Sequence, residues 1–177
     1  GANRGEGVGN KFLADIQQMD ALIHVLRCFD DDNLAHIEGS IDPLRDLEIV
    51  DFELQVRDLD LIERKILRFE KLQKTGDKDA KKGIDALTKF KNHLENFGNA
   101  RDLDASEDEF KYIEDILLLT AKPVIYVCNV DDSSATDGND YSKSVQEQLT
   151  NSGAEVLIIA GKMEEEIAEL KDRKTHV

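Results

Sequence analysis

Residues 124–132, with the sequence VIYVCNVDD, decide the fold class. The run 124–130 is almost continuously apolar, which is typical of a strand buried on both faces of a parallel sheet. Polar residues begin where this strand should end, and ligands of parallel α/β sheets bind at the carboxyl ends of the strands. We therefore expect a buried strand that leads directly into a ligand-binding loop.

Further strands and helices are expected on either side of this stretch. Residues 22–29 and 155–160 are also apolar runs of strand length, and we expect 22–29 to be buried on both faces as well. Helical patterns occupy the segments between and beyond the strands, at 11–19, 106–117, 141–150 and 163–170. Alternating strands and helices indicate an α/β fold with a parallel sheet and flanking helices.

A helical hairpin interrupts this alternation between the first two strands. The segments 47–73 and 79–97 carry apolar residues at helical spacing, and a Gly76 turn joins them. The expected apolar stripes are Phe52, Val56, Leu59, Ile62, Ile66 and Phe69 in the first helix, and Ile84, Leu87, Phe90, Leu94 and Phe97 in the second. The hairpin could be an arm that touches a large partner or could pack against its own domain, and the pattern alone does not distinguish the two.

Composition limits the classes of function. Among 177 residues, 38 are acidic and 23 are basic, giving a net charge of −15. Such a surface disfavours broad contact with a nucleic-acid backbone, so we expect no direct recognition of DNA sequence. Cys28 and Cys128 form no CxxC pair, and we expect them to be buried free thiols. With neither a membrane span nor a signal peptide in the sequence, we expect a cytoplasmic protein, and a monomer.

Two polar loops carry the chemistry that we expect. Asn129-Val130-Asp131-Asp132 ends the second strand, and a carboxylate at the fourth position can accept two hydrogens from a guanine edge while the Asn amide reaches N7. Ala160-Gly161-Lys162 ends the next strand, where a small residue allows backbone N–H groups to approach a base. Taken alone, the quartet also fits an ordinary turn. The sequence offers no metal-binding spacing.

His36 is a further candidate. It follows the acidic run 30–32 at the end of the first strand, where it could sense the state of a bound nucleotide or titrate near neutral pH. It also fits an ordinary histidine of a surface loop.

The chain resembles the YchF and Obg-like ATPase family, within the P-loop GTPase superfamily. The similarity lies in GEGVGNKFLA at 5–14, HVLRCF at 24–29, IDPL at 41–44 and EIAEL at 166–170, which follow the family's order over nearly the whole chain. It implies a P-loop NTPase G domain with an inserted antiparallel coiled-coil hairpin. It further implies ATP hydrolysis with Mg²⁺, weaker use of GTP, and work in the cytosol near the ribosome.

On this resemblance, 1–45 is the part of the G domain after the second switch, 46–118 is the hairpin insert with its return helix, and 119–177 is the base-binding half. Asn129 and Val130 would line the base, Asp131 and Asp132 would lie near its edge, and 160–162 would close the pocket. Asp132 stands where the family often has Glu, which weakens the implied preference for ATP.

The family's phosphate-binding loop, its Mg²⁺ ligands and its TGS domain are not among these 177 residues. We therefore expect no catalytic residue in this chain, which alone should not hydrolyse nucleotide, since phosphoryl transfer depends on those contacts. The leading hypothesis is part of a translation-associated ATPase. The alternative is a non-catalytic interaction module whose hairpin binds the ribosome or proteins.

Overall fold

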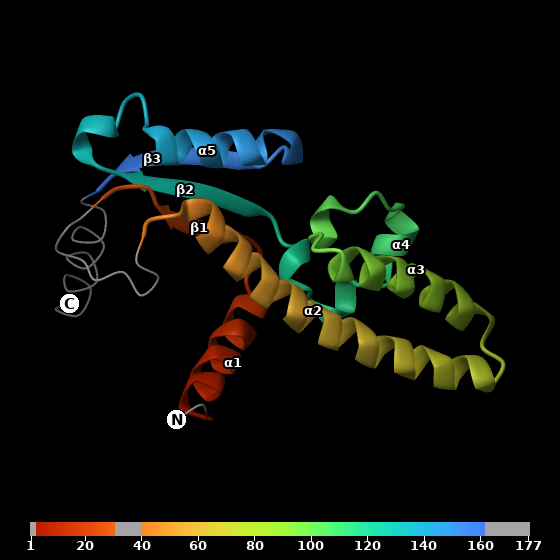
Figure 1. The fold of residues 1–177 in the computed structure, drawn as a ribbon. Coiled ribbons are helices and arrows are strands. Elements are labelled where there is room, and N and C mark those ends of the chain that lie inside the picture. The colour runs from red at the N-terminus through yellow and green to blue at the C-terminus, as the bar shows by residue number, and fades with distance from the viewer. Residues whose placement is uncertain (1–2, 31–39, 162–177) are drawn as a thin grey trace, which may run out of the picture. The chain divides into compact units, whose positions relative to one another are not determined.

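The computed structural model describes residues 3–30 and 40–161, and its contacts form two compact units (Figure 1). We call 1–22 with 49–123 the helical unit, and 23–48 with 124–177 the sheet unit. The elements are α1 (Asn3–Gln17), β1 (Leu22–Arg27), α2 (Pro43–Lys74), α3 (Lys78–Glu95), α4 (Glu107–Lys111), β2 (Val124–Val130), α5 (Asp140–Leu149) and β3 (Glu155–Ala160), with short 3₁₀ turns between some of them. The three-part division expected from the sequence stays a prediction.

The sheet has the parallel arrangement that the sequence predicted. Its strand order is β1-β2-β3, and β2 pairs with β3 in parallel from Ile125↔Glu155 to Val130↔Ala160. At β1, the Leu22 N–H donates to the Pro123 carbonyl over 2.9 Å and the Cys28 N–H donates to the Asn129 carbonyl over 2.8 Å. The partner's residue number on β2 rises by as much as the residue number on β1, which means that β1 and β2 run in the same direction. The α/β fold is thus confirmed, with β2 as the middle strand.

The core of the sheet unit lies on one face of the sheet. Tyr126, Cys128 and Val130 alternate onto this face, and side chains of α5 and of the first turns of α2 pack on them, namely Val145, Leu149 and Leu47. Figure 1 shows α5 running along β2 and β3. This arrangement places the described helical segments of the unit, α5 and the first turns of α2, against a single side of its strands.

The prediction that residues 22–29 are buried on both faces is wrong. Along β1, exposed and buried positions alternate, and Ile23 and Val25 are 68% and 48% exposed. Leu157 of β3 shares this face and is 45% exposed. Both helical segments that cover the sheet within the described part of the unit lie on its other face. On this face the apolar side chains of the outer strands β1 and β3 are exposed, whereas Val127 of the middle strand is only 7% exposed.

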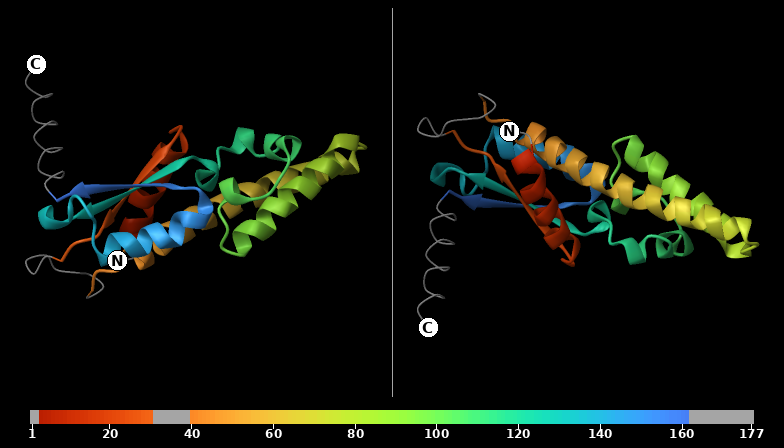
Figure 2. Two further views of the ribbon diagram at one scale, coloured as in Figure 1. Left: turned by 90° about the horizontal axis from the view of Figure 1, so that it is seen from above. Right: turned by 90° about the horizontal axis from the view of Figure 1, so that it is seen from below.

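The helical unit is built on the predicted hairpin (Figure 2). Gly76 turns the chain with φ +92°, a conformation that favours glycine. The Asp77 side chain then caps α3 by accepting from the N–H groups of Asp79 and Ala80. The core lies between the helices and the segment after α3, and it contains Ile62, Leu87, Phe90, Leu94, Ala100, Ile113, Ile116 and Leu118.

The predicted stripes need correction at the base of the hairpin. Phe52 and Val56 are 52% and 50% exposed, because the inward face of α2 there consists of Leu54, Gln55 and Asp58. Phe97 is 73% exposed, since α3 ends at Glu95 and the chain turns before Phe97 can continue the stripe.

The helix predicted for 106–117 is shorter than expected. The Ser106 capping box is present, but α4 ends at Lys111 and a 3₁₀ turn follows at Glu114–Ile116. Leu117 then adopts φ +50°, which no α-helix accommodates. The predicted helix 163–170 lies outside the described residues. Within 3–30 and 40–161, no helix is long and apolar enough to cross a membrane.

Candidate functional site

The two predicted loops lie side by side at the carboxyl edge of the sheet. The register pairs Asn129 with Ile159 and Val130 with Ala160, so both loops leave neighbouring strands at the same level. Gly161 follows β3, and a Cβ atom there would lie 3.2 Å from the Val130 carbonyl oxygen. Because that contact is tighter than ordinary packing allows, a residue without a side chain suits position 161.

Asn129 carries a buried polar atom with no partner. The residue is 6% exposed, and its Oδ1 makes no hydrogen bond among the described residues. An amide oxygen in such a position loses its hydrogen bonds to water without replacement, at a cost of roughly 1–3 kcal/mol. A ligand that donates a hydrogen to this atom would remove that cost, which makes Asn129 a fitting contact for a base.

The two acidic residues of the loop differ in their surroundings. Asp131 accepts a hydrogen bond from the Ser133 hydroxyl and a longer one, 3.4 Å, from Asn139 Nδ2. The hydrogen bonds from Ser133, Ser134 and Asn139 lower the pKa of Asp131 below its ordinary value. The Asp132 side chain is exposed and makes no hydrogen bond or ion pair with a described residue. Asp131 therefore shapes the loop, and Asp132 remains available to a ligand.

Asn139 organises this edge, although sequence reasoning did not single it out. Its Nδ2 donates to the Cys28 carbonyl over 2.6 Å, in addition to its bond to Asp131. Its Oδ1 accepts from the Ser142 N–H and begins α5 in a capping box. One side chain thereby joins the end of β1, the β2 loop and α5. The spacing Asn139-x-x-Ser142 was the available signal.

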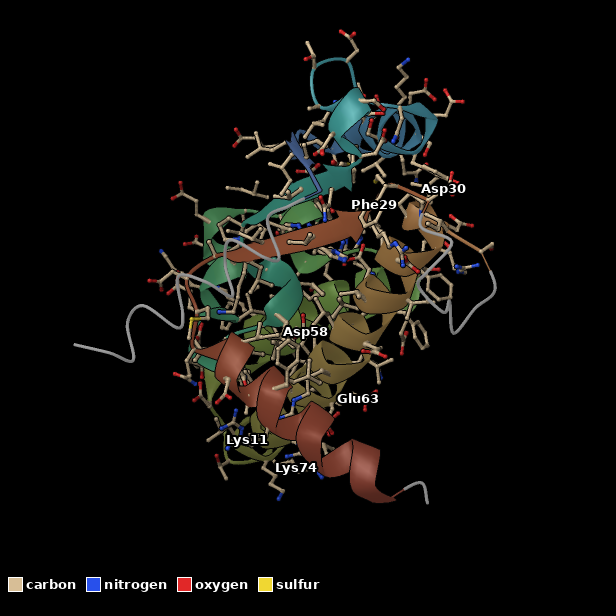
Figure 3. All side chains as sticks on the ribbon, turned by 90° about the vertical axis from the view of Figure 1, so that its left-hand side faces the viewer. Lys11, Phe29, Asp30, Asp58, Glu63 and Lys74 are labelled. Carbon is tan, nitrogen blue, oxygen red and sulfur yellow. The ribbon has the colours of Figure 1, made fainter. Side chains whose placement is uncertain are left out.

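Tyr141 and Asp30 add a second link between α5 and the end of β1. The Tyr141 hydroxyl donates to Asp30 Oδ1 over 2.8 Å, and this carboxylate raises the pKa of Tyr141. Figure 3 shows Phe29 and Asp30 at the end of β1. The ends of β1 and β2 are therefore held by two side chains of α5 and its cap.

The remaining positions predicted from the sequence add little to the description of the site. His36 and Lys162 lie outside the described residues. Cys28 and Cys128 are buried free thiols, as predicted, and the hydrogen bond between the two thiols, together with burial, raises the pKa of Cys28. Within the described ranges, no group of three or more His, Cys, Asp or Glu could hold a metal ion.

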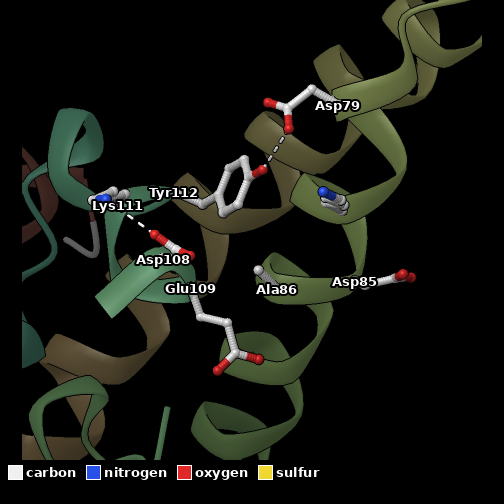
Figure 4. A pocket seen from close by; sticks show the side chains of 8 residues that line it. Asp79, Asp85, Ala86, Asp108, Glu109, Lys111 and Tyr112 are labelled. Atoms are coloured by element: carbon white, nitrogen blue, oxygen red, sulfur yellow. Dashed lines mark hydrogen bonds and ion pairs between the residues drawn. The ribbon is translucent and has the colours of Figure 1, made fainter. Parts of the chain in front are cut away.

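A groove of about 580 Å³ lies elsewhere, between α3 and α4 of the helical unit (Figure 4). Most of its charged groups pair with a neighbour, and only Lys82 and Asp85 have no ion pair or hydrogen bond with a described residue. The Tyr112 hydroxyl donates to Asp79 over 3.0 Å, Lys111 lies 3.0 Å from Asp108, and the neighbouring Lys89 lies 3.1 Å from Glu109. These pairs leave little unsatisfied charge for a ligand, and we assign no site to this groove.

The fold and the edge of the sheet together define a class of protein. A parallel sheet with Asn129 near the end of its middle strand and Asp132 just beyond it, and with a helical hairpin inserted between the first two strands, is a G-domain type of α/β protein. No family model matches the chain.

Individual proteins match it strongly. The ribosome-binding ATPase YchF of Bacillus subtilis is 41% identical over 173 residues, which cover 97% of this chain and 47% of the relative. YchF of Escherichia coli O157:H7 is 41% identical over 174 residues, covering 98% and 48%. Obg-like ATPase 1 of Oryza sativa subsp. indica is 35% identical over 160 residues, covering 89% and 41%.

A solved structure agrees with these relatives. The Schizosaccharomyces pombe YchF GTPase superposes with a TM-score of 0.76 at 29% identity, covering 85% of this chain and 42% of that one. The chain belongs to the family of YchF and Obg-like ATPases. It spans about half the length of the relatives it matches.

Proposed function

We propose that these residues form the base-binding half of a nucleotide site in a cytoplasmic, ribosome-associated protein that hydrolyses ATP, and GTP less well. The observation that carries the proposal is the buried, unpartnered Oδ1 of Asn129 at the carboxyl edge of the sheet. The names of the relatives support the reaction and the ribosome.

Asn129 suits a purine, and adenine in particular. An asparagine amide can donate to N7 and accept from the exocyclic amine N6, which is a bidentate contact that only adenine offers. Guanine presents an acceptor, O6, in place of that amine. The missing donor to Asn129 Oδ1 is therefore one that adenine can supply.

Asp132 makes the opposite contribution. Its exposed carboxylate can accept two hydrogens from the ring N–H and the amine on the Watson–Crick edge of guanine, whereas adenine presents an unprotonated ring nitrogen there. The two side chains thus favour different bases, which fits a protein that uses both nucleotides. Gly161 would admit the base beside the Val130 carbonyl, and Lys162 would flank it.

Phosphate and Mg²⁺ contacts do not enter this half of the site. The 177 residues contain no Gly-x-x-x-x-Gly-Lys-Ser/Thr sequence, and bound nucleotide would bring its Mg²⁺ to residues beyond them. The chain alone should therefore show no nucleotide turnover, and phosphate release by the pure 177-residue chain would contradict this. The hairpin remains the segment that we assign to ribosome or protein partners.

The test is a calorimetric titration of the complete protein containing these residues with ATP and with GTP. Asn129→Ala should weaken ATP binding by roughly tenfold, which corresponds to about 1.4 kcal/mol. Asp132→Asn should weaken GTP binding by at least as much and leave ATP binding nearly unchanged, because it removes a contact made only by guanine.

Asp137→Asn is the matched control, since Asp137 is exposed in the same loop and makes no hydrogen bond or ion pair with a described residue. It should bind both nucleotides as the parent protein does. If Asn129→Ala and Asp132→Asn also bind like the parent, the loops do not contact the base and the proposal fails.

A further inference from the structure

A second groove, of about 450 Å³, runs along α2 in the helical unit. Its floor is apolar and consists of Leu61, Leu67 and Ile116, while its rim carries Arg64, Arg68 and Lys71. Apart from Ile116, these residues recur every three or four positions and therefore share one face of α2. Gln17 Nε2 donates to the Ile116 carbonyl over 3.0 Å, which holds α1 at this part of the unit.

Packing explains only part of the floor of the groove: Ile116 belongs to the core of the helical unit and Leu61 packs against that core. The inward face of α2 at this level is formed by Ile62 and Lys65, which are buried. Leu67 lies on a different face and is 57% exposed. Leu67 is therefore an apolar side chain that no described residue covers, and with the half-buried Leu61 it gives the groove an apolar surface beside its cations.

The rim has unsatisfied positive charge. Arg64 pairs with Asp60 at 3.0 Å, but neither Arg68 nor Lys71 makes an ion pair or hydrogen bond with a described residue. In the groove of Figure 4, by contrast, most of the charges pair with one another, and the unpaired Lys82 and Asp85 are of opposite sign. On a chain with net charge −15, a cluster of cations around an apolar floor selects a partner of the opposite sign.

We propose that this groove binds an acidic amphipathic helix of a partner protein. The apolar face of such a helix would lie on Leu61 and Leu67, and its Glu or Asp residues would reach Arg68 and Lys71. The lining residues of α2 extend over about 15 Å, which matches two to three turns of a helix.

An RNA partner fits the groove less well. Phosphates would satisfy Arg68 and Lys71, but the backbone of a nucleic acid has no apolar side chain to place on Leu61 and Leu67. The proposal does not depend on nucleotide binding, because all the lining residues belong to the helical unit.

The test is fluorescence anisotropy of the full 177-residue chain with a labelled helical peptide of Leu and Glu, arranged so that Leu occupies one face. A peptide of the same composition in scrambled order and a labelled single-stranded RNA of similar length serve as competing probes. The amphipathic peptide should bind at least about tenfold more tightly than the scrambled one, because only it can present charge and an apolar face together.

Variants separate the rim from the floor. Arg68→Glu with Lys71→Glu should weaken peptide binding by about tenfold or more, and Leu67→Gln should weaken it about fivefold. Lys81→Glu with Lys82→Glu on α3 makes the same change of charge outside the groove and should have little effect. All of these residues are exposed, so circular dichroism should show unchanged folding.

Three results would overturn the proposal. The first is RNA binding more tightly than the amphipathic peptide, with Leu67→Gln having no effect on either probe. The second is equal binding of the amphipathic and scrambled peptides, which would mean that the groove recognises only the charge of a peptide. The third is the absence of peptide binding by the folded parent chain.

Discussion

At the scale of single residues, Phe97 stands in a conformation that usually belongs to glycine. Its φ is +62°, and the N–H groups of Phe97 and Gly98 donate to the carbonyls of Leu94 and His93, closing the end of α3. This is the turn that commonly places glycine just after a helix. The Phe97 ring is 73% exposed and contacts only the exposed ring of Phe52 among described aromatic residues, at 6.3 Å between centroids.

We expect Phe97→Gly to be more stable than Phe97→Ala by about 1 kcal/mol, because a Cβ atom is strained at positive φ and both variants lose the ring. Urea unfolding of the two variants measures the difference. Equal stability would mean that the backbone at position 97 is not left-handed in solution.

Residues differed in how well the sequence revealed them. The place of Asn129 and Asp132 at the carboxyl edge of the sheet could be predicted, because Asn129 lies near the end of an evident strand and Asp132 follows two residues after that strand ends. Asn139 could not be predicted as an organiser of the site, because its partner Cys28 lies 111 positions away. The different roles of Asp131 and Asp132 depend on which carboxylate the Ser133 hydroxyl bonds, and only the conformation of the folded loop decides that.

At the scale of elements, α2 shows why apolar spacing misplaced part of the hairpin's core. Its inward face includes Gln55, Asp58 and Lys65, all of them buried. Gln55 donates to Asn99, and Lys65 donates to the Tyr112 carbonyl and to Asp115. A polar residue can occupy a core position when distant segments satisfy it, and a single sequence does not show those segments.

Asp58 is the most constrained of these side chains. It accepts from the N–H groups of Leu119 and Thr120, both at 2.7 Å, and from the Thr120 hydroxyl at 2.6 Å. The Thr120 hydroxyl also accepts from the Ala100 N–H over 3.0 Å. Burial raises the pKa of Asp58 above its ordinary value of 3.8, although these hydrogen bonds oppose the shift. Figure 3 shows its place on α2.

Asp58→Asn should destabilise the chain by roughly 2 kcal/mol, because an amide NH₂ would face donors and leave a buried N–H unsatisfied. Since the folded pKa of Asp58 is raised, the stability contributed by its carboxyl group is full below the ordinary value of 3.8 and is lost as pH rises through the folded pKa. The parent should therefore lose part of its advantage over Asp58→Asn as pH rises from about 4 to 7.

Urea unfolding across this pH range checks the expectation, with Asp85→Asn on the exposed surface of α3 as the control. If the stability difference between the parent and Asp58→Asn grew with pH, the hydrogen bonds to Asp58 would have a larger effect on its pKa than its burial has.

At the scale of the whole molecule, the order of elements was predictable and the covering of the sheet was not. Strand and helix alternate in the sequence, and parallel strands require crossovers, so the sheet followed from the pattern. The apolar runs of β1 and β3 gave no sign that one face is left open at Ile23, Val25 and Leu157. Sequence patterns record which residues are apolar, whereas burial depends on where neighbouring elements pack.

The hydrogen bond between Leu22 and Pro123 has a consequence for the kinetics of folding. β1 and β2 are neighbours in the sheet but are separated by the whole hairpin, and closing so long a loop in an unfolded chain is entropically costly. Contacts inside the helical unit shorten that loop in advance, because Asp58 accepts from Leu119 and Thr120, 61 and 62 positions away, and so brings the end of the insert back to α2. Local helical contacts form faster than distant strand pairs.

We therefore expect the hairpin to fold first and to act as the nucleus on which β1 meets β2. Pulsed hydrogen exchange during refolding should protect the Thr120 N–H, which donates to Asp58, before the Cys28 N–H, which donates to Asn129 and joins β1 to β2. Protection of the Cys28 N–H before the Thr120 N–H would contradict the expectation that the hairpin folds first. An inserted arm that is usually regarded as an addition to the sheet would then be the part of the chain that makes rapid assembly of the sheet possible.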